Sequence, residues 1–168
     1  MNRRLLSGLF AFFLLLVGAQ RAQAQFDAGI PVGSRAPAPV INDLDGTPVD
    51  LGTVIGKKPV LVEFWATWCP ICAELFPKIQ AAHARYGDRV QFLVVAVAVN
   101  ETPRSIKSHL TSHPLPFPVL WDTNGNAVRA FQAPGTSFVV LLDGKGKVAY
   151  TGYGADQDID AAVRRLGG

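Results

Sequence analysis

Two long apolar runs constrain the fold of this chain more than any other feature. "VLVEFW" (60–65) and "VQFLVVAVAV" (90–99) are almost unbroken in apolar residues, which is typical of strands buried on both faces. The segment between them carries apolar residues at helical spacing, namely Ile71, Leu75, Ile79, Ala82 and Tyr86. A strand followed by a helix and a second strand predicts a parallel pair joined by a crossover. The sequence therefore predicts an α/β protein.

Shorter elements surround this unit. "PVIND" and "TPVDL" predict a small hairpin around the turn "DLDG". "TPRSIKSHLTSH" predicts a helix with Thr102 as N-cap and Pro103 at its first position. "SFVVLLD" and "KVAYTGY" predict a second hairpin, and "DQDIDAAVRRL" a last helix. The stretch "PLPFPVLWDTNGN" is rich in proline, and no element is assigned to it. Pro77 is expected to kink the helix between the two long strands.

The first 24 residues form a predicted signal peptide. Arg3 and Arg4 precede a 13-residue apolar run, and "AQA" (22–24) fits a peptidase site, so we expect cleavage after Ala24. The apolar run is short for a spanning helix, although an uncleaved membrane anchor is the alternative. Cleavage leaves residues 25–168 as a single domain in the periplasm or another extracytoplasmic space. The leader carries three arginines and no acid, so the remainder has 13 basic and 13 acidic residues. A chain with this balance has no net positive charge to attract the phosphates of a nucleic acid.

The chain has only two cysteines, Cys69 and Cys72, and their spacing and neighbours disfavour several of the known functions of cysteine pairs. Such a short loop would stabilise the fold very little as a disulfide staple. Haem attachment needs a histidine directly after the second cysteine, where the chain has Ala73. A thiol peroxidase is also disfavoured, because Thr67 is not placed three residues before Cys69.

A zinc site lacks ligands in the sequence. His83 lies eleven residues after Cys72 on the same predicted helix, which is about 16 Å along the axis. His109 and His113 are expected on the solvated surface of another helix. No metal is therefore assigned to the cysteines, and redox chemistry is favoured over metal binding.

The position of the pair favours electron transfer. Cys69 falls where a buried strand ends and a helix begins, so free N–H groups and the positive helix end would stabilise a thiolate. Pro70 fits the first helical position. Cys72 lies about one turn further along the same face. We expect Cys69 to be exposed and activated and Cys72 to lie deeper, as dithiol–disulfide exchange requires.

The segment "LVEFWATWCPICAELFP" closely resembles the active-site segment of the TlpA/ResA-like thiol–disulfide oxidoreductases, exported members of the thioredoxin superfamily. "VGSRAPAPVINDLDGTPVDL", "PFPVLWD" and "TSFVVLLDGKGKVAYTGYG" resemble the family's N-terminal hairpin, central insert and C-terminal hairpin. The resemblance implies a thioredoxin fold, with a central mixed β-sheet flanked by helices. It also implies a monomeric enzyme without a cofactor that reduces protein disulfides with electrons from a membrane donor, as in cytochrome c-type biogenesis.

By this resemblance, Cys69 is the attacking thiolate and Cys72 the resolving thiol. Glu63 matches the buried acid on the strand before the motif, where a raised pKa would let it relay the proton of Cys72. Glu74 is assigned to the helix surface. The expected substrate-binding residues are Trp68, Pro70, Ile71, Pro134, Gly135 and Thr136.

One segment departs from the family pattern. The family presents a cis-proline opposite the cysteines, whereas this chain has "APGTSF" (133–138). Either Pro134 is the cis residue with a shift of one position, or Gly135 replaces the proline and the site lacks it. Three other functions stay open from the residues: a metallochaperone that passes a soft metal such as Cu(I), a disulfide oxidant, and a redox-silent binding module.

Overall fold

The computed structural model describes residues 28–167, and its centre is a seven-stranded mixed sheet. The strand order is β2-β1-β5-β4-β3-β6-β7. Strands β3 (Val60–Trp65), β4 (Gln91–Val97) and β5 (Val119–Asp122) are parallel, and the helix α1 (Pro70–Tyr86) connects β3 to β4. The predicted parallel pair and its crossover are therefore confirmed.

Antiparallel strands complete both sides of the sheet. The hairpin of β1 (Val40–Asp43) and β2 (Pro48–Asp50) adds to β5 on one side, with a short 3-10 turn (Leu51–Thr53) after it. The hairpin of β6 (Phe138–Leu142) and β7 (Val148–Tyr153) adds to β3 on the other. This is the expected thioredoxin fold with an N-terminal hairpin.

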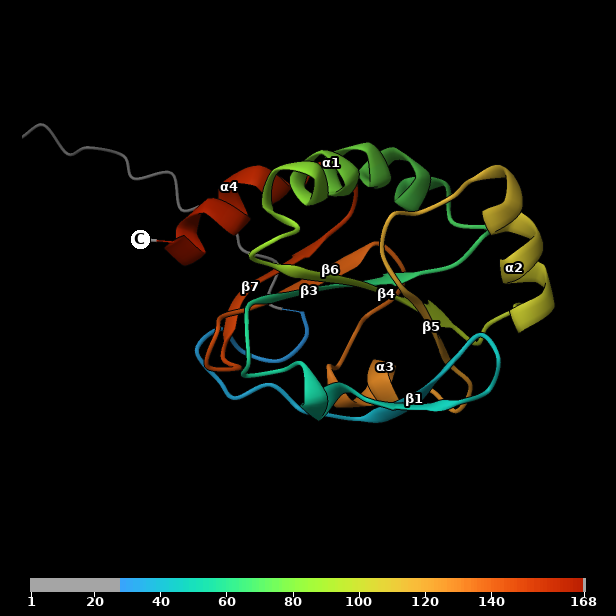
Figure 1. Ribbon diagram of the computed structural model, residues 1–168, viewed down its shortest axis with the longest axis horizontal. Coiled ribbons are helices and arrows are strands. Elements are labelled where there is room, and N and C mark those ends of the chain that lie inside the picture. The colour runs from blue at the N-terminus through green and yellow to red at the C-terminus, as the bar shows by residue number, and fades with distance from the viewer. Residues whose placement is uncertain (1–27, 168) are drawn as a thin grey trace, which may run out of the picture.

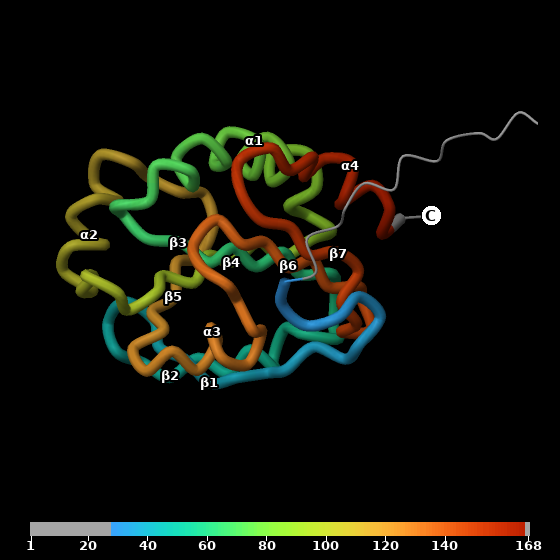
Figure 2. Tube along the Cα trace, turned by 180° about the vertical axis from the view of Figure 1, so that it is seen from behind, coloured from blue at the N-terminus to red at the C-terminus, as the bar shows by residue number. Residues whose placement is uncertain are grey.

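The helices form layers on both faces of the sheet. Figure 1 shows α1 and α4 (Ile159–Arg164) side by side over the central strands, and α3 (Asn126–Ala130) on the opposite face near β1. The helix α2 (Pro103–Ser112) lies beside α1, beyond the end of β4, as the view from behind also shows (Figure 2). A 3-10 turn (Arg165–Gly167) ends the described chain.

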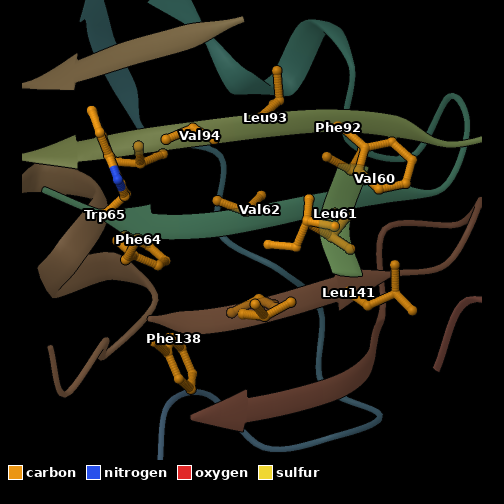
Figure 3. Packing of buried hydrophobic residues seen from close by; sticks show 14 of the residues in the cluster. Val60, Leu61, Val62, Phe64, Trp65, Phe92, Leu93, Val94, Phe138 and Leu141 are labelled. Atoms are coloured by element: carbon orange, nitrogen blue, oxygen red, sulfur yellow. The ribbon is translucent and has the colours of Figure 1, made fainter. Parts of the chain in front are cut away.

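The core explains why β3 is so apolar. All six of its residues are buried, because helices cover both faces of the sheet (Figure 1). Figure 3 shows Val60, Leu61, Val62, Phe64 and Trp65 of β3 among residues of the neighbouring strands. Side chains alternate between the two faces, so the ring of Trp65 contacts Phe76 of α1 at 5.9 Å between centroids. The ring of Phe64 instead contacts Phe131, which follows α3, also at 5.9 Å.

Several local predictions are confirmed and two are wrong or incomplete. Thr102 caps α2, with Pro103 in its first turn, and acids and arginines occupy opposite ends of the α4 region. The helix α1 continues through Pro77, and the expected kink stays a prediction. The buried stripe of α1 begins at Cys72 rather than Ile71, which is 41% exposed, because Cys72 lies one turn before Leu75. The proline-rich stretch contains β5 and leads into α3, neither of which was predicted.

Candidate active site

The two cysteines form a disulfide at the junction between the end of β3 and the start of α1. Cys69 is the N-cap of α1, and its sulfur accepts a hydrogen bond from the backbone N–H of Cys72 at 3.1 Å. Pro70 follows in the first turn, where a missing N–H costs nothing. The Cys69 sulfur therefore lies at the positive end of a 17-residue helix.

The two sulfurs differ in access less than the sequence suggested. Cys69 is 6% exposed and Cys72 is fully buried. The order of access agrees with the expectation, but the expectation that Cys69 is an exposed residue is wrong. Its chain neighbours Trp68 and Pro70 are exposed instead.

Exposed apolar side chains surround the disulfide at this end of the sheet. Trp68 directly precedes Cys69 and is 48% exposed, and its indole N–H donates to the carbonyl of Val99 at 2.8 Å. Pro70 and Ile71 are exposed on the other side of Cys69. Val99 and Tyr153, at the ends of the β4 and β7 segments, are also largely exposed. This set of residues leaves an apolar surface around the sulfur pair.

Glu63 lies at the centre of β3, paired between Val94 of β4 and Val139 of β6. It is fully buried, and neither carboxylate oxygen has a hydrogen-bond partner among the described residues. Burial raises the pKa of Glu63 well above its ordinary value of 4.5, since an ionised carboxylate in this apolar layer would lose its hydration. By strand alternation its side chain points to the same face as Trp65, which is the face covered by α1.

The segment Pro134–Ser137 leads into β6 beside the end of β3. Ser137 donates its backbone N–H to the carbonyl of Phe64 at 2.7 Å and adopts a left-handed φ of 61°. The carbonyl of Ser137 accepts from Gly154 and from the side-chain amide of Gln157. No peptide bond in residues 28–167 is cis, so the bond before Pro134 is trans and the first alternative for this segment is wrong. Gly135 lies near the ring of Tyr153.

A cavity of about 390 Å³ opens beside Cys69, and the sequence did not predict it. Trp65, Thr67 and Cys69 line one side, Phe76, Pro77 and Gln80 of α1 another, and His109, His113 and Leu115 close it. The prediction that His109 lies on the solvated surface is incomplete, because it is half-buried and its ring packs on Trp65 at 5.5 Å and on His113 at 4.3 Å. Burial, followed by the neighbouring His113, lowers the pKa of His109. His113 itself is exposed, as expected.

Glu101 is a second acid near the site, and the sequence did not predict its place there. Glu101 lies between β4 and α2 with 8% exposure, and its carboxylate accepts the backbone N–H of Thr67 and the hydroxyl of Ser105. The only signal in the sequence was an acid directly before the predicted N-cap Thr102. Its partner lies 34 residues away, so pattern alone could not connect them.

Two further findings, on metal sites and on membrane helices, concern residues 28–167. Within that range no group of three or more His, Cys, Asp or Glu side chains could hold a metal ion. No helix in the same range has the length and apolar character to cross a membrane. The predicted signal peptide and its cleavage site lie outside the described residues.

Comparisons with known proteins agree with the geometry. Residues 31–166 match the Redoxin family. The thiol-disulfide oxidoreductase ResA of Bacillus thuringiensis subsp. konkukian (strain 97-27) is 30% identical over 168 residues, covering 94% of this chain and 95% of the relative. The thioredoxin-like protein YneN of Bacillus subtilis (strain 168) is 28% identical, covering 88% of each chain.

Solved structures give the same result. A crystal structure from Chlorobium tepidum, described as a thiol:disulfide interchange protein DsbE, superposes with a TM-score of 0.72 and 26% identity. The match covers 83% of this chain and 99% of that one. The chain therefore belongs to the Redoxin family and is, within it, a ResA-like thiol–disulfide oxidoreductase with a thioredoxin fold.

Proposed function

We propose that this enzyme works outside the cytoplasm and reduces disulfides in protein substrates, with Cys69 as the attacking sulfur and Cys72 as the resolving one. The observation that carries the proposal is the hydrogen bond from the Cys72 N–H to the Cys69 sulfur at the start of α1. In the reduced enzyme this N–H and the helix dipole favour the thiolate of Cys69. Cys72 has no access to solvent, so a substrate reaches Cys69 first.

The reaction transfers two electrons in two exchange steps. The Cys69 thiolate attacks one sulfur of the substrate disulfide, a Cys69–substrate bond forms, and the other substrate sulfur leaves as a thiolate that takes a proton. Cys72 then loses its proton and attacks the Cys69 sulfur, which releases the second substrate thiol and forms the Cys69–Cys72 disulfide. A dithiol donor at the membrane reverses these steps on the enzyme and restores the reduced pair.

Glu63 is the proposed acceptor of the Cys72 proton. Burial raises the pKa of Glu63, so its ionised carboxylate is a stronger base for the Cys72 proton than that of an ordinary glutamate. It lies on the strand that leads to the cysteines and on the face covered by α1, which carries Cys72. Among the described residues no other group competes for its oxygens.

The apolar surface supports a polypeptide substrate. Trp68, Pro70 and Ile71 form one part of the proposed binding surface, and Pro134, Gly135 and Thr136 form the part that leads into β6. Exposed apolar groups around a reactive sulfur suit an extended segment of a protein partner. The side chains of Pro70 and Ile71 place no cation or hydrogen-bond donor between the cysteines, which favours the reducing direction, because strong oxidants stabilise their thiolate more. The predicted leader supports an extracytoplasmic location.

Trapping tests the proposal directly. In Cys72→Ala the first exchange step proceeds but the second cannot, so a substrate protein stays covalently bound to Cys69. We expect adducts in non-reducing gels of Cys72→Ala that disappear with a strong reductant and are absent from a Cys69→Ala/Cys72→Ala double variant. Adducts formed instead by Cys69→Ala through Cys72 would reverse the assigned roles.

A further inference from the structure

We infer that Glu101 is a positioning residue for the reaction: its buried carboxylate holds the segment before Cys69 and so keeps the Cys69 sulfur at the start of α1. This inference rests on the proposed function, because it assigns Glu101 a part in the reactivity of Cys69. Glu101 touches neither cysteine in the described contacts and acts through Thr67.

The contacts of Glu101 join the segment that follows β3 to the segment that follows β4. One carboxylate oxygen accepts the backbone N–H of Thr67, two residues before Cys69, and the other accepts the Ser105 hydroxyl at 2.7 Å. Ser105 belongs to the capping box of α2 together with Thr102. A carboxylate that is 8% exposed needs such partners, and charge-assisted bonds of this kind are stronger than those between neutral groups.

A second bond holds the next residue of the same segment. The indole N–H of Trp68 donates to the carbonyl of Val99 at 2.8 Å. Thr67 and Trp68 are thus both tied to the Val99–Glu101 stretch, and the N–H of Cys69 itself bonds back to Ala66 at 3.1 Å. The backbone between β3 and α1 is therefore held immediately before its reactive sulfur.

The position of Cys69 depends on this hold. A helix N-cap needs an extended backbone, and Cys69 has φ −88° and ψ 102°. If Thr67 loses its acceptor, its N–H is left without a partner at a partly buried site and the loop relaxes to find water. The sulfur then moves away from the Cys72 N–H that stabilises its thiolate. The Ser105 contact extends the effect to α2, which carries His109 at the cavity beside Cys69.

Two substitutions at Glu101 separate the effect of its hydrogen bond to Thr67 from the effect of its negative charge. Glu101→Gln keeps an oxygen for the Thr67 N–H and offers an amide to Ser105, but it removes the negative charge. Glu101→Ala removes both. Both variants lose a negative charge near Cys69, which favours its thiolate. Only the alanine variant also loses the hydrogen bond to the Thr67 N–H, which disfavours the thiolate. We therefore expect a higher pKa for the Cys69 thiol in Glu101→Ala than in Glu101→Gln, measured by pH-dependent alkylation of the reduced protein.

The exchange rate should follow the same order. We expect the alanine variant to reduce a protein disulfide about tenfold more slowly than the glutamine variant at pH 7, since small misplacement of a reacting group has effects of this size or larger. A role confined to stability would lower the melting temperature of Glu101→Ala without separating the two variants in thiol pKa.

Asp122 provides a matched control. It is a buried acid that also accepts backbone N–H groups, from Ala127 and Val128, but it holds α3 on the opposite face of the sheet. Asp122→Ala should cost stability and leave the pKa of Cys69 where it is. If Glu101→Ala proves too unstable to study, Ser105→Ala removes one of the two hydrogen bonds that hold the Glu101 carboxylate and should raise the pKa of Cys69 in the same direction.

The outcomes are distinguishable. Equal Cys69 pKa values in Glu101→Ala and Glu101→Gln, or no rise in Ser105→Ala where it replaces the alanine variant, would overturn the inference. So would a shift in Asp122→Ala as large as that in Glu101→Ala. A wild-type enzyme that reduces no protein disulfide would instead refute the proposed function, while the pKa comparison would still report on Glu101.

Discussion

At the residue scale, the fully buried Glu63 makes stability depend on pH. The pKa of Glu63 is raised above 4.5 in the folded protein by burial, so folding favours its protonated form. Below pH 4.5 both states are protonated and the fold loses nothing. As the pH rises toward the folded pKa, the unfolded state releases the proton first, so the free energy of unfolding falls. Each unit of raised pKa costs about 1.4 kcal/mol at high pH.

The variant Glu63→Gln should remove this dependence. We expect it to be more stable than wild type at pH 8 and nearly equal to it at pH 4, by chemical denaturation of the oxidised proteins. It should also resolve mixed disulfides more slowly, because Cys72 loses its proton acceptor. Glu74→Gln, which neutralises an exposed acid on α1, is the control and should change neither property. A parallel pH profile for Glu63→Gln and wild type would argue against a raised pKa for the buried Glu63.

The individual residues also show which features of the site can be predicted from the sequence and which cannot. The N-cap position of Cys69 followed from Pro70 and the end of an apolar strand, because these signals are local. Ile71 was placed in the buried stripe because it is apolar, although Cys72 fills that position. Glu101 and His109 reached the site through contacts between distant segments, which no local pattern encodes.

At the scale of elements, Asp160 joins α4 to α1. Its carboxylate accepts from the Tyr86 hydroxyl at 2.9 Å and pairs with Arg85 and Arg164. The Tyr86 hydrogen bond is the main reason that the pKa of Asp160 lies below its ordinary value of 3.8, with Arg85 and Arg164 acting in the same direction. The contribution of Asp160 to stability is therefore present above pH 3.8 and is lost as the pH falls through the lower folded pKa.

We expect Asp160→Asn to lower the melting temperature by about 2 °C at pH 7, since these contacts are largely exposed. The difference from wild type should shrink as the pH approaches 3, because wild-type Asp160 is then losing its charge as well. Thermal unfolding at both pH values measures this. An equal difference at both would assign the effect to packing rather than to charge.

The elements that sequence reasoning missed are the short ones with long-range partners. The strand β5 has four residues and follows Pro118, so its apolar run is brief and its flanks resemble a loop. It becomes a strand because β4 and β1 supply hydrogen bonds on both sides. The helix α3 has five residues and no side-chain cap of its own. By contrast, β3, β4 and α1 were predictable because their periodicity extends over enough residues to be unambiguous.

At the scale of the whole molecule, the direction of electron flow and the stability of the fold are linked through one cycle. Reducing the disulfide and unfolding the chain can occur in either order, so their free energies must balance. If the folded enzyme is more reducing than its own unfolded cysteine pair, folding must stabilise the oxidised form more than the reduced form. The short loop adds little entropy to this balance, so the difference comes from the folded environment of the sulfurs.

The surroundings of the sulfurs predict the sign. Reduction places a thiol at the fully buried Cys72, on the α1 side of a sheet in which Glu63 has no hydrogen-bond partner among the described residues, and gives the Cys69 thiolate no cation from Pro70 or Ile71. We therefore expect the oxidised protein to resist denaturant better than the reduced protein, by about 1.4 kcal/mol for every 30 mV that separates the folded pair from the unfolded one. Denaturation with and without a strong reductant gives the difference, and a Cys69→Ser/Cys72→Ser variant should show none. Greater stability of the reduced protein would mean that the fold drives disulfide formation in its partners, and electrons would then flow in the opposite direction.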